Sequence, residues 1–190
     1  MNRRIMATAV SFLLIFTLCG CGNGSTTEEY EGSNTAEIKK DGAITSTIQD
    51  SFLTQQYDEE LLEEFTLKEA AEYNHEKGEG AISIKKLEVK NDKVTLVMEY
   101  RTAEDFGNFN QYPFFCGTVE EAFAAGYDFN GVDFYEAGTA SEKEDQVEKV
   151  SIQAEKLKEM GSRRIVIAQL PEEEILKVKT SGKILYISGA

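Results

Sequence analysis

The chain of 190 residues carries 34 acidic against 20 basic side chains, which is a formal net charge of −14. A surface this acidic repels nucleic-acid phosphates and anionic lipid headgroups, so we expect neither as a partner. Two of the three cysteines lie close to the N-terminus and leave Cys116 as a single thiol, which excludes an internal disulfide in the remaining chain.

The first 20 residues have the composition of a secretory signal peptide. Arg3 and Arg4 precede an apolar run over residues 9–18, and small residues follow that run. The run is shorter than the roughly 20 residues that span a bilayer as a helix, so we expect a cleaved leader and no transmembrane anchor. Removal of residues 1–20 leaves 18 basic against 34 acidic residues, a net charge of −16.

The segment Leu18-Cys19-Gly20-Cys21 resembles the lipobox of bacterial lipoproteins, because a cysteine directly follows the small Gly20. The resemblance implies that Cys21 receives a diacylglycerol on its sulfur and becomes the mature N-terminus. It also implies a lipid-anchored position at the extracytoplasmic face of the cell membrane, where two acyl chains on one residue hold a protein stably. Lipidation of Cys19 is the alternative, but cleavage would then follow the bulky Leu18.

Residues 22–40 are rich in Gly, Ser, Thr, Asn and Glu and carry almost no apolar side chain. This composition is typical of a flexible tether. We therefore divide the mature chain into the lipidated cysteine with its tether, residues 21–40, and a folded domain, residues 41–190. About 150 residues are enough for a single domain with a proper core.

A strand and a helix are expected at the start of this domain. Residues 43–48 are rich in β-branched side chains and predict the strand. Asp58 is a typical N-cap for a helix that ends before Gly78, whereas Thr66 with Glu69 matches a capping box and predicts a break near Thr66. The apolar positions that indicate the helix are Leu61, Leu62, Phe65 and Tyr73.

The clearest local pattern is a hairpin with its turn at Asn91-Asp92. Farther from this turn the alternation of apolar residues slips by one position, and an extra residue at Lys85-Lys86 restores it. We therefore predict a β-bulge at Lys85-Lys86. The expected cross-strand pairs are Val89–Val94, Leu87–Leu96, Ile84–Met98 and Ile82–Tyr100.

Two short helices are expected after the hairpin. Thr102 is a candidate cap for a helical turn over residues 103–109. Thr118 with Glu121 predicts a capping box for a helix over residues 119–125, which Gly126 ends.

The last third of the chain predicts strands at residues 150–154 and, after a Gly161-Ser162 turn, at residues 164–170. A final hairpin at Ser181-Gly182 is expected to pair Val178 with Leu185 and Leu176 with Ile187. No helix here is long enough for a parallel crossover. The sequence therefore predicts an α+β fold, a mainly antiparallel sheet of hairpins with one longer helix and one or two short helices packed on it.

His75 and Cys116 are the candidates for catalysis. His75 lies near a helix end, where an imidazole interacts well with the helix dipole, and a single histidine excludes a multi-histidine zinc site. Cys116 follows the apolar run Pro113-Phe114-Phe115, which is typical of a buried, inert thiol. The sequence also lacks the hydrolase elbow, the Walker loop and the dinucleotide fingerprint. We therefore assign no catalytic residue, no metal ligand and no cofactor.

Residues 106–135 stand out because they hold 10 of the 19 aromatic side chains, interleaved with amides and acids. Exposed rings beside such polar groups suit the binding of a sugar or an extended peptide. The alternative is that the rings fill the core while the polar residues shape turns. The candidate ligand contacts are three rings and three polar side chains, Tyr112, Phe129 and Tyr135 with Asp128, Asn130 and Asp133.

The three polar side chains of this segment also raise the possibility of calcium binding. An EF-hand loop needs an acid or amide at its fifth position, glycine at its sixth and glutamate at its twelfth. Counted from Asp128, these positions hold Val132, Asp133 and Thr139. The pattern therefore predicts no EF-hand, and any calcium site at Asp128, Asn130 and Asp133 would be irregular.

Four segments beyond the lipobox carry a further resemblance: Asp58-Glu59-Glu60-Leu61, Thr102-Ala103-Glu104-Asp105-Phe106, Gly117-Thr118-Val119-Glu120-Glu121-Ala122 and Gly182-Lys183-Ile184-Leu185-Tyr186. Their order resembles that of small uncharacterised lipoproteins of Gram-positive Clostridia, which implies a surface location and no particular activity. We interpret the chain as a non-catalytic binding or interaction domain whose partner is a glycan, a peptide or another envelope protein. The alternative is a carboxylate-based hydrolase of glycan or peptide.

Overall fold

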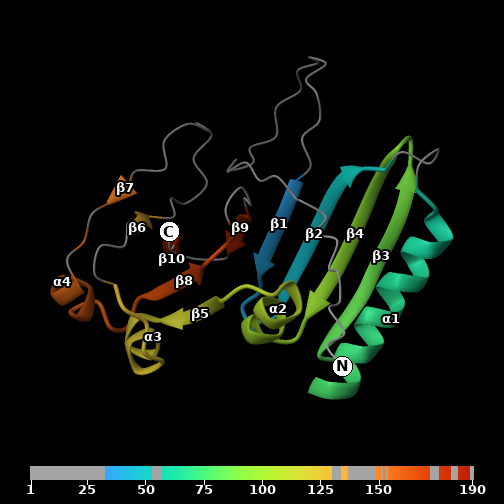
Figure 1. Ribbon diagram of the computed structural model, residues 1–190. Coiled ribbons are helices and arrows are strands. Elements are labelled where there is room, and N and C mark those ends of the chain that lie inside the picture. Colours follow the sequence, from blue (N-terminus) through green and yellow to red (C-terminus); the bar gives the residue numbers. More distant parts are fainter. Residues whose placement is uncertain are drawn as a thin grey trace, which may run out of the picture.

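The computed structural model describes residues 33–52, 57–129, 134–136, 149–150, 152, 154–171, 176–180 and 184–188. These residues form four helices and ten strands, arranged in two five-stranded sheets that lie next to each other along the molecule (Figure 1). Six strand pairs are antiparallel and two are parallel. The fold is α+β, with mainly antiparallel sheets and one longer helix, as the sequence predicted.

Sheet A has the strand order β3-β4-β2-β1-β9, and sheet B has the order β5-β8-β10-β6-β7. The strands of sheet A are β1 (Ser33–Ile38), β2 (Ile44–Ser51), β3 (Ile82–Lys90), β4 (Lys93–Tyr100) and β9 (Lys177–Thr180). Those of sheet B are β5 (Phe114–Thr118), β6 (Phe134–Glu136), β7 (Lys149–Val150), β8 (Arg164–Ala168) and β10 (Ile184–Ser188).

The first strand, β1, lies inside the segment that we expected to be a tether. It sits between β2 and β9 in sheet A, so the expected boundary at residue 41 is wrong. Only alternate side chains of a strand need to be apolar, and here Ala36 and Ile38 are the ones buried in the core. Such a short alternation is hard to distinguish from a polar linker by composition alone. The strand predicted at residues 43–48 is confirmed as part of β2.

The longest helix, α1 (Glu59–Lys77), begins as expected, because the Asp58 side chain accepts hydrogen bonds from the backbone N–H groups of Glu60 and Leu61. The predicted break near Thr66 is wrong. Thr66 is buried within the helix, and its hydroxyl donates to the Leu62 carbonyl at 2.7 Å instead of capping a new helix. Leu61 and Phe65, which we expected on the buried face, are 63% and 61% exposed.

The predicted hairpin is confirmed in every pair. β3 and β4 place Val89 opposite Val94, Leu87 opposite Leu96, Ile84 opposite Met98 and Ile82 opposite Tyr100, with the register shift between Ile84 and Lys86. The turn residues Asn91 and Asp92 have positive φ angles of 53° and 56°. This conformation is typical of the type I′ turns that match the twist of a two-residue hairpin.

The two short helices are also confirmed. In α2 (Ala103–Asn110) the Thr102 hydroxyl accepts from the Asp105 N–H, and in α3 (Val119–Ala124) Thr118 and Glu121 form a complete capping box. A further helix, α4 (Ala154–Lys158), was not expected. Of the strand predicted over residues 150–154, Val150 lies in β7 (Lys149–Val150), whereas Ile152 lies outside any strand and Ala154 begins α4, so the prediction is wrong at these two residues.

The prediction of a final hairpin is wrong. β9 pairs with β1 in sheet A, whereas β10 pairs with β8 and β6 in sheet B, so the two segments diverge into different sheets. Both the β1–β9 and the β8–β10 pairs are parallel. Local turn chemistry favoured a hairpin, but β9 forms an edge of sheet A, whereas β10 lies between β8 and β6 in sheet B. The strand expected at residues 164–170 is confirmed as β8.

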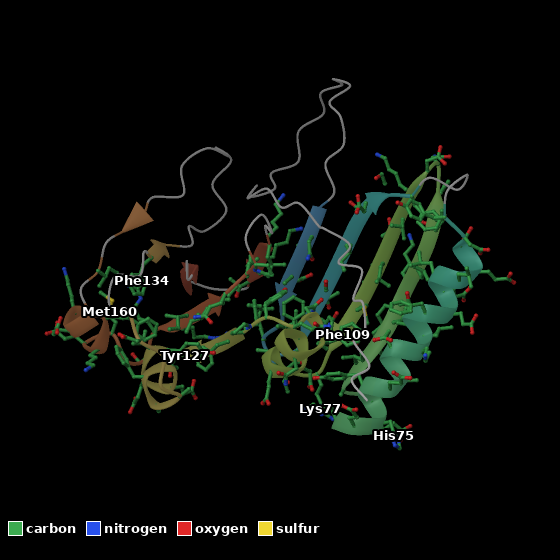
Figure 2. All side chains as sticks on the ribbon, viewed as in Figure 1. His75, Lys77, Phe109, Tyr127, Phe134 and Met160 are labelled. Atoms are coloured by element: carbon green, nitrogen blue, oxygen red, sulfur yellow. The ribbon has the colours of Figure 1, made fainter. Side chains whose placement is uncertain are left out.

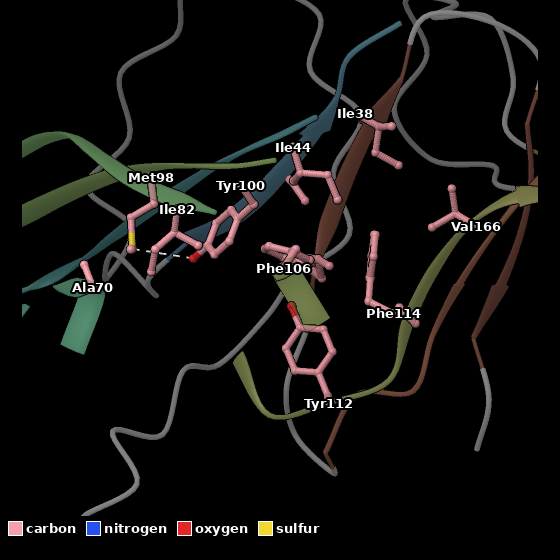
Figure 3. Close-up of a cluster of buried hydrophobic side chains, with 13 residues drawn as sticks. Ile38, Ile44, Ala70, Ile82, Met98, Tyr100, Phe106, Tyr112, Phe114 and Val166 are labelled. Atoms are coloured by element: carbon pink, nitrogen blue, oxygen red, sulfur yellow. Dashed lines mark hydrogen bonds between the residues drawn. The ribbon is translucent and has the colours of Figure 1, made fainter. Parts of the chain in front are cut away.

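Two apolar clusters fill the interior, one on each face of β8. Cluster 1 joins sheet A, α2, β5 and β8, and at its centre the Phe106 ring lies 5.0 Å from that of Tyr100 and 4.8 Å from that of Phe114 (Figure 3). Val166 and Ala168 of β8 belong to cluster 1. The buried residues of cluster 2 are Val119, Ala122, Phe129, Phe134, Leu157, Ile165 and Ile167.

An ion-pair network links β3, β4 and the residue after β1 on the face of sheet A opposite cluster 1. The Glu99 carboxylate pairs with Lys39 and, at 2.6 Å, with Lys85, the residue that the bulge leaves outside the β3–β4 register. Hydrogen bonds from these two ammonium groups lower the pKa of Glu99 to about 2. The folded state therefore favours the ionised carboxylate more strongly than the unfolded chain does.

Glu99→Gln should change the pH dependence of stability. Because the pKa of Glu99 is lowered on folding, its contribution is complete above the unfolded-state value of about 4.3 and is lost as the pH falls towards 2. In urea titrations we expect the variant to be less stable than the wild type by up to about 1 kcal/mol at neutral pH, and the two proteins to converge near pH 2. Glu72→Gln, which removes an exposed partner of Lys68, is the control. An equal difference at both pH values would contradict this account.

Candidate functional site

Two of the expected ligand contacts are core residues. Tyr112 is 6% exposed in cluster 1, and Phe129 is 3% exposed in cluster 2. The Phe129 ring lies 4.8 Å from the Phe123 ring in an edge-to-face arrangement, and Tyr112 packs similarly on Phe106. The expectation that these two rings present exposed stacking faces is wrong, because both complete aromatic clusters beneath the sheets.

The other four expected contacts form no site in the described part of the chain. Asp128 is exposed, Tyr135 holds a position on β6 opposite Tyr186, and Asn130 and Asp133 lie outside the described residues. Among the residues that the structure describes, no three His, Cys, Asp or Glu side chains are placed to hold a metal ion. The calcium alternative at Asp128, Asn130 and Asp133 involves two residues that lie outside the described ones.

The aromatic segment does border a hollow, but with other side chains. A groove of about 540 Å³ lies along β5, between the start of α2 and the residues that follow α3. Its walls come from the Asp41-Gly42 turn, residues 101–104, three residues of β5, and Ala125 with Tyr127. We call this hollow the edge groove, because β5 is the outermost strand of sheet B.

One wall of the edge groove is aromatic. The half-buried rings of Phe115 and Tyr127 lie 5.3 Å apart, and Figure 2 shows Tyr127 next to α3. Burial raises the pKa of the Tyr127 hydroxyl, which keeps it neutral and able to donate a hydrogen bond. This wall combines apolar contact area with one polar group.

Polar side chains line an adjoining hollow. Glu104 and Tyr127 also line a second hollow of about 430 Å³, together with Asn108 and Gln111. Gln111 ends α2 with a φ angle of 62°, a conformation that residues other than glycine adopt infrequently. The two adjoining hollows therefore place carboxylate and amide groups beside the aromatic wall.

A buried carboxylate holds α2 in place beside the groove. Asp105 accepts hydrogen bonds from the Thr102 hydroxyl at 2.8 Å and the Tyr73 hydroxyl at 3.2 Å, and Arg101 Nε lies 3.7 Å from it. Tyr73 belongs to α1, so this carboxylate ties the two helices together. These contacts occupy Asp105, and we assign it a structural role.

Cys116 and His75 lie on different parts of the molecule. Cys116 is on β5, whereas His75 is exposed in the last turn of α1, the helix that packs beside β3 of sheet A (Figure 2). Burial raises the pKa of the Cys116 thiol, and the Arg164 guanidinium, with Nη2 3.5 Å from Sγ, opposes this rise only in part. The thiol is therefore protonated at neutral pH, which is the less nucleophilic form.

No protein-family model, no curated protein and no solved structure matches the chain. None of the helices in the described residues has the length and apolar character needed to cross a bilayer.

Gly107→Ala should disturb the packing of α2 on β5. A Cβ at this position would lie 2.8 Å from the Tyr112 carbonyl oxygen and 3.0 Å from the Phe114 nitrogen, both on the backbone. We expect the free energy of unfolding to fall by about 1–3 kcal/mol, as for other overpacked sites. Gly161→Ala, with its nearest atom at 3.6 Å, is the control and should change it little. A Gly107→Ala protein as stable as the wild type in urea would contradict the close approach.

Proposed function

We propose that the protein is a lipoprotein anchored through Cys21 at the outer face of the cell membrane, and that its folded part is a non-catalytic binding domain. The anchor is supported by the lipobox segment Leu18-Cys19-Gly20-Cys21 and by the basic and apolar leader before it. The binding role is supported by the edge groove. Its ligand is a glycan or an extended peptide, which includes a peptide segment of another envelope protein.

The composition of the edge groove is the observation that carries the binding role. Phe115 and Tyr127 offer apolar contact area, while Asp41, Glu104 and, in the adjoining hollow, Asn108 offer polar atoms. Ligand sites commonly combine a mostly apolar lining with a few polar groups that fix orientation. The acidic side chains disfavour nucleic acids, in agreement with the net charge of −14.

A carboxylate-based hydrolase of glycan or peptide is the second candidate, because Asp41 and Glu104 both line the edge groove. Paired carboxylates are the usual machinery of glycoside hydrolysis. Turnover of a glycan or peptide library by the purified protein, abolished by either Asp41→Asn or Glu104→Gln, would establish the hydrolase and refute the non-catalytic role.

Cys21→Ser should remove the anchor. The variant lacks the sulfur that would carry the lipid, so we expect it in the soluble fraction of disrupted cells and the wild type in the membrane fraction. Mass spectrometry of the wild type should find Cys21 as a lipid-modified N-terminus. Cys19→Ser is the matched control and should stay membrane-bound. A Cys21→Ser protein that sediments with membranes as fully as the wild type would refute the lipoprotein assignment.

Tyr127→Ala should weaken ligand binding. Glycan and peptide arrays probed with the detergent-solubilised mature protein should yield a ligand whose affinity falls at least tenfold, about 1.4 kcal/mol, when this ring is removed from the groove. Leu67→Ala, which alters an exposed residue on α1, should bind like the wild type. Thermal unfolding checks that both variants are folded. Equal affinity of all three proteins would exclude the edge groove as the site.

A further inference from the structure

We propose that the edge groove binds an extended peptide, which adds to the open edge of β5 as a further antiparallel strand and carries a basic residue between two apolar ones. This inference rests on the proposed function, because it names the ligand of the same groove.

The hydrogen-bond pattern of β5 shows which of its backbone groups are free. Gln169 N–H donates to the Pro113 carbonyl, and Val119 N–H donates to the Arg163 carbonyl. In an antiparallel pair the residues that exchange hydrogen bonds alternate along the strand. Phe115 and Gly117 are therefore the strand residues bonded to β8, and the N–H and C=O groups of Phe114, Cys116 and Thr118 face the outer edge.

Of these outward-facing residues, Cys116 is the one that remains open. The Thr118 N–H is taken by the Glu121 carboxylate at 2.8 Å, and α2 packs against the Phe114 nitrogen at Gly107. The N–H and C=O groups of Cys116 have no hydrogen-bond partner within the described residues. Cys116 also lines the edge groove. A strand edge with a free donor and acceptor beside a groove is the requirement for strand addition.

The faces of β5 determine which side chains the peptide needs. Residues directly opposite each other in an antiparallel pair project to the same face, so the peptide residue opposite Cys116 lies on the side of cluster 1 and α2. There Glu104 lines the groove, while the Arg101 guanidinium is already engaged with Asp105. A basic side chain is therefore favoured at this central position.

The two neighbouring peptide residues project to the other face. That face carries Phe115, which packs with Tyr127 against cluster 2. Apolar side chains are favoured there, because they cover these half-buried rings and remove apolar surface from water. The groove volume of about 540 Å³ and the single open pair at Cys116 suit a short segment and not a long strand.

The proposal is tested with synthetic peptides of about five residues that alternate valine and lysine, titrated into the detergent-solubilised mature protein and followed by fluorescence anisotropy. One peptide carries an N-methyl group on the central lysine, whose N–H would bond to the Cys116 carbonyl. A second carries it on a neighbouring valine, whose N–H would point away from β5. We expect the first modification to weaken binding at least tenfold and the second to change it less than threefold.

Two variants at Cys116 test the protein side of the same hydrogen bonds. Cys116→Pro removes the outward N–H while leaving the bonds of Phe115 and Gly117 to β8, and proline is tolerated on edge strands in this orientation. We expect it to weaken binding at least tenfold. Cys116→Ser keeps the N–H, so we expect it to bind at least fivefold more tightly than the proline variant. Thermal unfolding reports whether the proline variant is folded, and the N-methyl series on the wild-type protein decides the question if it is not.

Several results would overturn strand addition. Equal sensitivity to both N-methyl positions, or full binding by a folded Cys116→Pro protein, would show that side chains alone hold the peptide. Binding of glycans in place of every peptide on the arrays would also overturn it, while leaving the proposed binding function intact. Absence of any ligand, glycan or peptide, would refute both.

Discussion

The burial of β8 on both faces is the constraint on which the rest of the structure depends. Val166 and Ala168 pack into cluster 1 with sheet A and α2, while Ile165 and Ile167 pack into cluster 2 with α3 and α4. Such a strand cannot alternate apolar with polar residues, and its sequence does not. Because β8 holds β5 on one side and β10 on the other, it also positions the outer edge of sheet B, and with it the edge groove.

Local features of the fold could be predicted from the sequence where short-range chemistry decides them. The type I′ turn at Asn91-Asp92 and the capping box of Thr118 depend on residues within a few positions of one another. The bulge at Lys85 follows from the alternation of apolar residues along the two strands of that same hairpin. The separation of β9 from β10 could not be predicted, because β9 pairs with the distant β1 while β10 pairs with β8 and β6 instead of with the strand directly before it. The helix break predicted at Thr66 is wrong for a similar reason. Thr66 is buried where α1 packs on the core, and its hydroxyl bonds to the Leu62 carbonyl instead of capping a new helix.

The candidate site was predicted as a region but not as residues. Aromatic density indicated residues 106–135, and the edge groove takes Phe114, Phe115 and Tyr127 from this segment. Density alone could not separate rings such as Tyr112 and Phe129, which fill the clusters, from those at the surface. The groove also depends on residues distant in sequence, such as Asp41, and on an open backbone edge at Cys116, for which no side-chain pattern exists.

The central claim is that β8 makes the two sheets one cooperative unit, and hydrogen exchange in an Ile165→Val variant tests it most directly. Ile165 belongs to cluster 2, and the loss of one methylene should cost about 1 kcal/mol. If the sheets unfold together, the slowest-exchanging amides of β4 in sheet A should exchange about fivefold faster, as should those of β8 itself. Faster exchange confined to sheet B, with β4 unchanged, would contradict the claim.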